Sequence, residues 1–324
     1  MQRQTISVAL CTYNGERFVA QQLESLTKQI RAPDELIICD DGSTDQTLRI
    51  IHDFIRSAPF PVELHVHNEN LGSTGNFEKA IKACHGDFIA LCDQDDYWLP
   101  EKLATLESCL INNPGIGLAF SDAQIVDVNL VATPTRLRES TLFTRDLERR
   151  LLSGEATQVM LQRKVVTGAT VLFRAEFRES FLPIPASWVH DGWIAFIIAL
   201  FSELAYVNQP LIQYRQHSDQ QIGAVDRSLR VILRRQPRFN RAEFHKQWEQ
   251  TLDLGEFLGR LSFPNSDAVR SQVLKKASHL KARAEMPERR LSRIPIILSQ
   301  YPAYRLYAQG WKSAFRDLVA ENHG

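Results

Sequence analysis

Residues 88–100 read Phe-Ile-Ala-Leu-Cys-Asp-Gln-Asp-Asp-Tyr-Trp-Leu-Pro, an apolar run followed by three aspartates and the start of a helix. Carboxylates packed this closely repel one another, and a shared divalent cation would relieve that repulsion. Mg²⁺ or Mn²⁺ bound by one or two carboxylates completes its shell with water and substrate phosphates. The stretch therefore predicts a metal site for a phosphate-bearing substrate. A solvated acidic turn that caps the helix near Pro100 is the alternative.

Short apolar runs alternate with helical patterns on both sides of this stretch. Strands are predicted at 6–11, 35–39, 62–67, 88–92 and 117–120, and helices at 16–28, 44–57, 76–84 and 101–112. This alternation predicts an α/β fold with a doubly wound, mainly parallel sheet. Ligands bind such sheets at the carboxyl ends of the strands. The polar motifs all follow predicted strands, at 12–15, 40–43, 68–75 and 93–96. We therefore expect four loops to converge on one edge.

The chain divides into two parts by charge and pattern. Its net charge is zero, but residues 1–225 carry 19 Lys and Arg against 28 Asp and Glu, whereas residues 226–324 carry 19 against 10. We predict an α/β domain at 1–225 and a basic, mostly helical segment at 226–324. The basic segment fits contact with an anionic membrane. A solvated basic face is the alternative, and no recognisable motif supports nucleic-acid binding.

Cysteines and apolar runs indicate the compartment. The five cysteines are odd in number and lack zinc-like spacing, which predicts buried thiols in a reducing cytoplasm. No signal peptide precedes the first predicted strand, and the longest apolar run, 193–201, is too short to span a bilayer. We expect a cytoplasmic protein, soluble or peripheral on the inner membrane.

Residues 40–45, Asp-Asp-Gly-Ser-Thr-Asp, follow the second predicted strand. Gly42 suits the turn, and Ser43, Thr44 or Asp45 suits the cap of the next helix. One aspartate is then left without a capping role. At Asp41, a carboxylate can accept the imide N–H of uracil or thymine. An ordinary turn with a capped helix is the alternative.

Two residues nearer the end of the α/β domain are candidates on their chemistry. Asp191 comes just before the apolar run 193–201, where it suits an N-cap or a general base. His217 follows a strand-like run and becomes a candidate ligand only where a metal site exists. Neither a Gly-x-Gly-x-x-Gly motif after the first strand nor a Walker-type Gly-Lys-Ser/Thr is present. Dinucleotide oxidoreductases and P-loop NTPases therefore lose their main support.

Taken in order, these motifs resemble the inverting glycosyltransferases of family 2, and most of all the rhamnosyltransferase-like branch that builds bacterial surface polysaccharides. The resemblance covers residues 5–223. It is carried by Val8 to Gly15, Gln22 to Ser25, Gln29, Asp40 to Asp45, Asn70 to Gly72, Asn76-Phe77, Asp93 to Trp98, Lys102, Gly168, His190-Asp191 and Tyr214 to His217.

This resemblance implies a GT-A-type fold, a nucleoside-diphosphate-sugar donor and a divalent cation, Mn²⁺ or Mg²⁺. It implies nucleotide-sugar contacts at Cys11, Thr12, Tyr13, Asn14, Asp41, Asn76, Asp93 and Gln94, metal ligands at Asp95 and His217, an acceptor side at Gly168, His190 and Trp193, and a catalytic base at Asp191. Asp96 is left to cap the following helix. The expected donor is a dTDP-sugar, with rhamnose favoured, or a UDP-sugar. The expected acceptor is a glycan or a lipid-linked glycan.

Departures from the family pattern narrow this expectation. Gly192 stands where relatives often carry a bulky aromatic residue, and the Gln-x-x-Arg-Trp signature of processive synthases is absent, which favours single addition. A UDP-hexose or UDP-N-acetylhexosamine transferase of the same fold is the first alternative. A sugar nucleotidyltransferase would need a Gly-rich basic loop where this chain has Thr-Tyr-Asn-Gly-Glu. A non-catalytic binding module would be expected to lose a metal or base residue.

Overall fold

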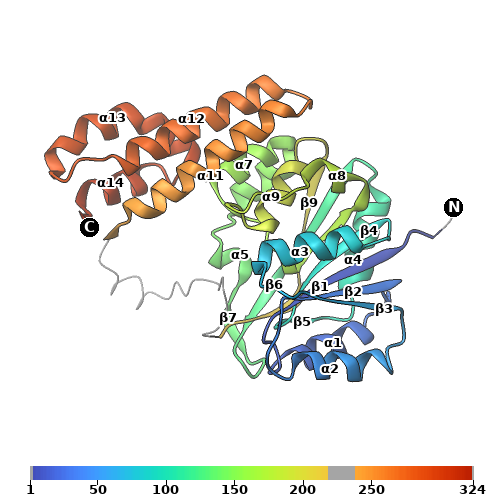
Figure 1. The fold of residues 1–324 in the computed structure, drawn as a ribbon. Coiled ribbons are helices and arrows are strands. Elements are labelled where there is room, and N and C mark those ends of the chain that lie inside the picture. The colour runs from blue at the N-terminus through green and yellow to red at the C-terminus, as the bar shows by residue number, and fades with distance from the viewer. Residues whose placement is uncertain (1–2, 218–237, 323–324) are drawn as a thin grey trace. The chain divides into compact units, whose positions relative to one another are not determined.

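The computed structural model describes residues 3–322 apart from 218–237 (Figure 1). The chain forms two compact units. The N-terminal unit comprises residues 1–156 and 165–225, and the C-terminal unit comprises 157–164 and 226–324. Residues 157–164 thus leave the N-terminal unit and pack with the C-terminal helices. Each unit is described separately below.

The N-terminal unit is built on a nine-stranded sheet. Its strands are β1 (Ile6–Thr12), β2 (Glu35–Asp40), β3 (Val62–Val66), β4 (Phe88–Asp93), β5 (Tyr97–Trp98), β6 (Ile116–Val126), β7 (Ala132–Arg136), β8 (Val171–Arg174) and β9 (Glu203–Arg215). Their order is β3-β2-β1-β4-β8-β6-β9-β5, with β7 paired to β6. Strands β1 to β4 are parallel, whereas β8 is antiparallel to both β4 and β6.

Helices cover both faces of this sheet, as expected for a doubly wound fold. They are α1 (Val19–Thr27), α2 (Thr47–Ile55), α3 (Gly72–Ala83), α4 (Lys102–Asn112), α5 (Leu137–Ser140), α6 (Arg145–Arg150), α8 (Arg178–Phe181) and α9 (His190–Ile198), with 3-10 turns at Gly168–Thr170 and Ala175–Phe177 and a π turn at Leu151–Glu155. Apolar residues of α1, α2 and α4 share one core with the strands. Helix α3 packs on β1 and β2 and meets α9.

The sheet is more mixed than the sequence indicated. Strand β8 runs opposite to both of its neighbours, β5 is antiparallel to β9, and β7 is antiparallel to β6. Strands β5 and β7 were not predicted, since one has two residues and the other, Ala-Thr-Pro-Thr-Arg, lacks a buried apolar face. The fold class itself, an α/β sheet covered by helices, is confirmed.

The C-terminal unit is helical, with α7 (Ala156–Gln162), α11 (Arg241–Arg260), α12 (Ser266–Ala284), α13 (Arg290–Tyr307), α14 (Trp311–Val319) and a short pair of strands, β10 (Arg238–Phe239) and β11 (Glu321–Asn322). A buried ion pair fixes three of its helices: Arg283 of α12 donates to both carboxylate oxygens of Asp317 at 2.7 and 3.0 Å, and Tyr304 of α13 donates to Asp317 at 2.7 Å. Among the described helices, none combines the length and apolar character needed to cross a membrane.

Candidate active site

The loops after β1, β2 and β4 are joined by hydrogen bonds at the carboxyl edge of the sheet. Thr12 Oγ1 donates to Asp40 Oδ2 at 2.6 Å, and Asn14 N donates to Ser43 Oγ at 2.8 Å. Tyr13 and Gln94 bond reciprocally, through Tyr13 N to Gln94 Oε1 and Gln94 Nε2 to Tyr13 O, both 2.9 Å. These bonds bring the predicted nucleotide-sugar residues of β1 and β4 into one surface.

Gly15 explains why this loop can lie so close to Gln94. A Cβ atom at position 15 would lie 2.1 Å from Gln94 Oε1, so any other residue would displace that side chain. Gly15 N also donates to Thr47 Oγ1 of α2 at 2.8 Å. The glycine therefore keeps Gln94 bonded to the backbone of Tyr13, whose side chain is 44% exposed at the rim of the edge.

The two aspartates of the β2 turn have different partners. Asp40 accepts hydrogen bonds from Thr12 and from Ser43 N and Oγ. Gly42 makes the predicted turn with a φ of 81°, a left-handed conformation that favours glycine. Asp41 accepts from Leu71 N at 2.7 Å and from Gly72 N at 2.9 Å, so its charge stabilises the N-terminus of α3. Each oxygen of Asp41 keeps a second lone pair that can accept another hydrogen bond. The contact of Asp41 with a nucleobase stays a prediction.

Asn76 and Cys11 lie beneath this surface. Asn76 is buried on α3, and its Nδ2 donates to Cys39 O at 2.9 Å, which ties the helix to the end of β2. Cys11 is buried on β1 opposite Asp93, and burial raises the pKa of its thiol. Both residues therefore shape the edge from below, and their contacts with a nucleotide sugar stay predictions.

Asp93 ends β4 amid other acids. Its side chain makes no hydrogen bond within the described residues and is partly buried. Burial raises its pKa to about 7, and the charges of Asp95 and Asp191 act in the same direction. A carboxylate in this position is electrostatically unfavourable unless a cation or a hydrogen-bond donor approaches it.

Asp95 and His217 meet across a separation of 122 residues in sequence. His217 Nε2 lies 2.8 Å from Asp95 Oδ2, and both side chains are largely shielded from solvent. Strand β9 pairs with β5, which directly follows the aspartates in sequence. This pairing brings His217, two residues beyond the end of β9, beside Asp95. Within the described residues, no group of three or more His, Cys, Asp or Glu side chains is arranged to hold a metal ion.

Asp96 does not cap the following helix, contrary to the expectation from sequence. Its Oδ1 accepts from Arg215 N at 3.0 Å, and α4 begins after Glu101 without a side-chain cap. Burial, with Asp95 and Asp93 nearby, raises the pKa of Asp96 well above its usual range. Asp96 therefore ties the acidic turn to β9, which brings His217 to Asp95.

Two buried cations, Lys102 and Arg215, lie beside these acids and had no predicted role. Lys102 donates from Nζ to Ala169 O at 2.8 Å, and burial lowers its pKa to about 7 although Asp96 and Asp93 oppose that change. Arg215 donates to Asp95 O at 2.7 Å and to Gln21 Oε1 at 2.6 Å. Both lie inside the family-like motifs, but polar neighbours such as Glu101 and Gln216 leave no local signal that these cations are buried.

Asp191 lies in the first turn of α9, and Val189 holds the N-cap position. Its Oδ1 accepts from Gly192 N at 2.5 Å and its Oδ2 from Gly168 N at 3.3 Å. Two backbone donors therefore orient this carboxylate. Its negative charge lies close enough to Asp93 to raise the pKa of Asp93. The structure thus brings Asp191 to the same edge as Asp93 and Asp95.

The remaining acceptor-side residues face inward. His190 is buried and stacks on Phe77 with ring centroids 4.0 Å apart, and neither ring nitrogen has a hydrogen-bond partner among the residues that the structure describes. Burial lowers the pKa of His190. A Cβ at Gly168 would lie 2.9 Å from His190 Nε2, which explains a glycine there. Trp193 is fully buried and donates from Nε1 to Phe181 O at 2.7 Å, so its role beside an acceptor stays a prediction.

Residues 7–169, about half of the chain, match the family described as glycosyl transferase family 2. An uncharacterized protein of Mycobacterium tuberculosis is 28% identical over 216 residues, which cover 66% of this chain but only 59% of that relative. The dTDP-rhamnosyl transferase RfbG of Shigella flexneri is 25% identical over 229 residues, 66% of this chain and 74% of RfbG. The putative glycosyltransferase EpsH of Bacillus subtilis is 34% identical over 225 residues, 67% of this chain and 62% of EpsH.

Solved structures share the fold. S. aureus TarS in complex with UDP-GlcNAc matches 97% of this chain and 80% of the TarS chain, with a TM-score of 0.60 and 18% identity. The mannosyltransferase PcManGT from Pyrobaculum calidifontis, in complex with GDP-Man and Mn²⁺, matches 98% of this chain and 87% of its own, with a TM-score of 0.52 and 17% identity. This likeness confirms the expected GT-A-type fold.

Proposed function

Because the chain belongs to glycosyl transferase family 2, we propose that it is a metal-dependent inverting glycosyltransferase that moves a sugar from a nucleoside-diphosphate sugar to an acceptor hydroxyl. The observation that carries this proposal is the convergence of Asp93, Asp95, His217 and Asp191 on the carboxyl edge of the sheet. Four residues from three distant segments meet where α/β sheets bind their ligands.

Asp95 and His217 are suited to hold a divalent cation. Their contact atoms, a carboxylate oxygen and an imidazole nitrogen, already lie 2.8 Å apart, and Mn²⁺ accepts both ligand types. Two protein ligands leave coordination positions for water and for the diphosphate of a donor, which is how Mg²⁺ and Mn²⁺ are usually bound beside phosphates. When bound, the cation would neutralise charge that develops on the departing nucleoside diphosphate.

Asp191 is proposed as the general base. The N–H groups of Gly168 and Gly192 fix its carboxylate, so it can accept the proton of an acceptor hydroxyl without reorienting. The attacking oxygen would reach the anomeric carbon on the side opposite the diphosphate, and this displacement inverts the anomeric centre. Asp93 would then contact the ribose or the sugar, where a hydroxyl donor offsets its desolvation.

The proposed donor is dTDP-rhamnose, because a dTDP-rhamnosyl transferase is among the relatives. The proposed acceptor is a glycan or lipid-linked glycan of bacterial surface polysaccharide, at the cytoplasmic face of the inner membrane. A UDP-hexose or UDP-N-acetylhexosamine donor is the second candidate, since TarS shares the fold and was solved with UDP-GlcNAc. Asp41 would accept the same imide N–H from uracil or thymine, so the base contact does not separate them.

The test is nucleoside diphosphate release from a panel of dTDP-, UDP- and GDP-sugars with Mn²⁺, Mg²⁺ or EDTA, with and without a lipid extract. We expect release from one dTDP- or UDP-sugar that requires the cation and increases with acceptor. Release of pyrophosphate would instead indicate nucleotidyl transfer. Donor binding with no release under any condition would indicate a non-catalytic binding module and overturn the proposal.

A further inference from the structure

The outer face of α13 is apolar although it is exposed. Leu291, Ile294, Leu298 and Tyr301 recur every three or four residues, which places them along one stripe of the helix. Leu291 is 81% exposed and Leu298 is 70% exposed. Single exposed leucines are ordinary on soluble proteins, but a continuous apolar stripe indicates an interaction surface.

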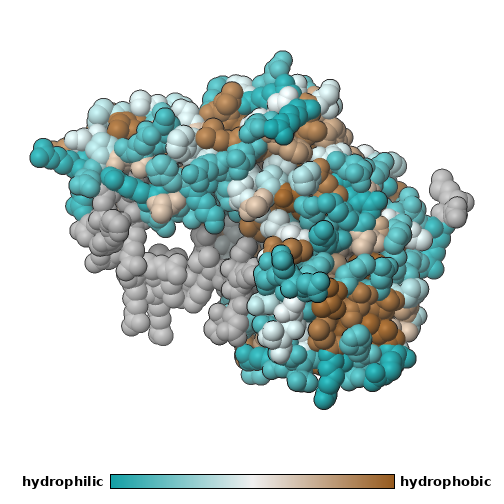
Figure 2. Space-filling view, viewed as in Figure 1, coloured by the Kyte–Doolittle hydropathy of each residue, from teal (hydrophilic) through white to brown (hydrophobic). Residues whose placement is uncertain are grey.

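Helix α14 also exposes large apolar side chains. Trp311 and Phe315, four residues apart on one face of α14, are 64% and 58% exposed, and α14 packs against α13. Hydrophobic residues interrupt the hydrophilic surface of the C-terminal helices in Figure 2. We call these six side chains the α13–α14 surface: Leu291, Ile294, Leu298, Tyr301, Trp311 and Phe315.

The exposed charged side chains of α13 and α14 all have one sign. Between residues 289 and 320 the exposed charged side chains are Arg289, Arg290, Arg305, Lys312 and Arg316. The one acid of this range, Asp317, is buried and bonded to Arg283 and Tyr304. Tertiary packing therefore removes the negative charge and leaves apolar and basic groups on the outside.

We propose that the α13–α14 surface docks onto an anionic membrane, with its apolar side chains in the headgroup region and its arginines and lysine near lipid phosphates. Interfacial helices combine Leu, Phe and Trp on one face with Lys and Arg beside them in this way. This inference rests on the proposed function in one respect: a lipid-linked acceptor would be present at the same membrane.

Two other occupants fit this surface less well. In a two-fold dimer the same patch meets itself, which would bring five basic side chains of each copy together and cost affinity through like-charge repulsion. Nucleic acid would use the arginines, but phosphate contacts leave the exposed leucines and isoleucine in water. An anionic bilayer satisfies both the charges and the apolar side chains.

The test is flotation of the full-length protein with vesicles of phosphatidylcholine alone or mixed with phosphatidylglycerol, at low and high salt. We expect the wild type to float with anionic vesicles at low salt, and to be released as salt screens the charges. Leu291→Glu with Leu298→Glu should abolish flotation. Arg305→Gln with Lys312→Gln should weaken it by about 25-fold, about fivefold for each charge removed.

Leu274→Glu is the matched control, because Leu274 is 62% exposed on α12 and lies outside the α13–α14 surface. It should float like the wild type, and thermal melts should show that every variant is folded. If wild-type protein stays unbound with anionic vesicles, or if the Leu291/Leu298 variant floats equally well, the inference is wrong. It also fails if the wild type sediments as a dimer that these substitutions dissociate while vesicles bind neither form.

Nucleoside diphosphate release, measured on the same preparations without vesicles, separates this inference from the proposed function. If a variant loses flotation but still releases nucleoside diphosphate, the substitution has changed membrane binding by the α13–α14 surface and leaves the proposed function intact. If the wild type floats with anionic vesicles but releases no nucleoside diphosphate from any donor, the membrane inference is supported and the proposed function is contradicted.

Discussion

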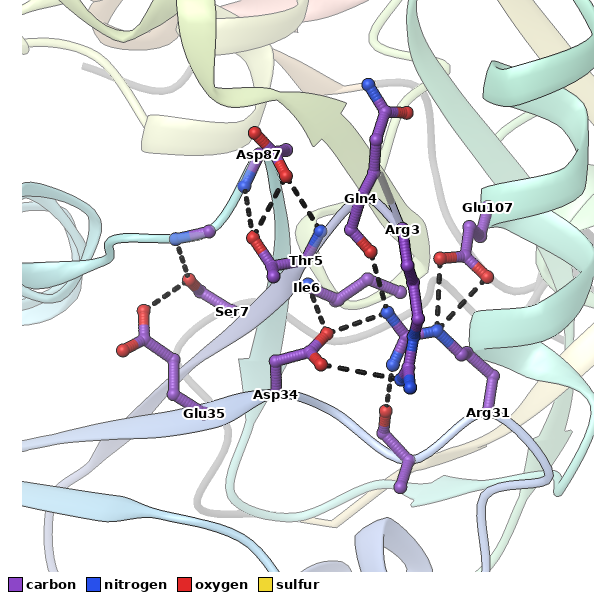
Figure 3. Close-up of polar contacts among 12 residues, drawn as sticks. Arg3, Gln4, Thr5, Ile6, Ser7, Arg31, Asp34, Glu35, Asp87 and Glu107 are labelled. Carbon is purple, nitrogen blue, oxygen red and sulfur yellow. Dashed lines mark hydrogen bonds and ion pairs between the residues drawn. The ribbon is translucent and has the colours of Figure 1, made fainter. Parts of the chain in front are cut away.

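The two edges of the main sheet carry the same acidic residue types in opposite environments. At the amino edge, shown in Figure 3, Asp34 accepts from Ile6 N at 2.8 Å and from Arg31 Nη2 at 2.7 Å. Glu35 accepts from Ser7 Oγ at 2.5 Å and from His85 N at 2.6 Å. Burial acts against ionisation at both positions, but these donors hold the pKa of each carboxyl below its ordinary value.

At the carboxyl edge the balance is reversed for the acids that follow β4, although Asp40 and Asp41 at the end of β2 have hydrogen-bond donors. Burial raises the pKa of Asp93 to about 7 and that of Asp96 well above its usual range, and neighbouring acids add to both shifts. Protein groups satisfy the amino-edge acids completely, so those acids stabilise the fold. Asp93 and Asp96 are left at an electrostatic cost that a cation and a substrate can relieve. The proposed active site therefore lies where the charge of the carboxylates is least compensated by protein groups.

The largest expected effect is on catalysis at the carboxyl edge. Asp191→Asn removes the proposed base but keeps the shape of the side chain, whose single amide oxygen can accept from Gly168 N or Gly192 N but not from both. Transfer should fall by about 10²- to 10⁴-fold, the usual contribution of general-base catalysis, with donor affinity unchanged. Steady-state kinetics and donor titration measure the two quantities. Asp87→Asn at the amino edge, where Asp87 accepts from Thr5, is the control and should keep wild-type turnover. Full activity in Asp191→Asn would refute the assignment.

The next effect concerns cation binding. Mn²⁺ with UDP at a hundred times the dissociation constant should stabilise the wild type by about 2.7 kcal/mol, because the ligands bind only the folded state. Asp95→Asn should lose most of this gain in a thermal shift assay. Asp146→Asn, an exposed aspartate on α6, should keep it. Equal stabilisation of all three proteins would show that Asp95 holds no cation.

Substitutions at the amino edge should change the free energy of unfolding rather than the catalytic activity. Arg31→Ala leaves Asp34 and Glu107 without their guanidinium, which should cost about 2 kcal/mol of unfolding free energy, the usual value for hydrogen bonds to charged groups. Urea unfolding measures this loss, and turnover should not change. Arg260→Ala, which breaks an exposed pair with Glu256, should stay within about 0.5 kcal/mol. A drop in turnover of folded Arg31→Ala protein would remove the functional distinction between the edges.

The smallest effect is in pH dependence. Glu35 has a folded pKa below the ordinary 4.5, so its stabilisation is complete above that value and is lost as pH falls through the folded pKa. Because Glu35 is partly exposed, we expect Glu35→Gln to lose less than about 1 kcal/mol at neutral pH. The unfolding free energies of the variant and the wild type should converge as pH falls below the folded pKa of Glu35. A constant difference at every pH would contradict this linkage.

Much of the site was predictable because it follows parallel strands. Thr12, Asp40 and Asp93 come directly after apolar runs, with Asp41 next to Asp40, and parallel pairing brings such positions to one edge. The partners of each carboxylate were not predictable. Asp96 bonds to Arg215, 119 residues away, and the cap expected at α4 is absent, because a carboxylate binds whichever donor the tertiary fold supplies.

The sequence by itself determined the alternating strands and helices, the family and the types of residue at the strand ends, because these depend on local periodicity and short motifs. Only the tertiary structure decided which acids are paired. It placed Arg31 beside Asp34 at one edge and His217 beside Asp95 at the other, and it buried Asp317 so that α13 and α14 expose only basic charge. Electrostatic environment depends on burial and on neighbours distant in sequence, and neither can be derived from local pattern.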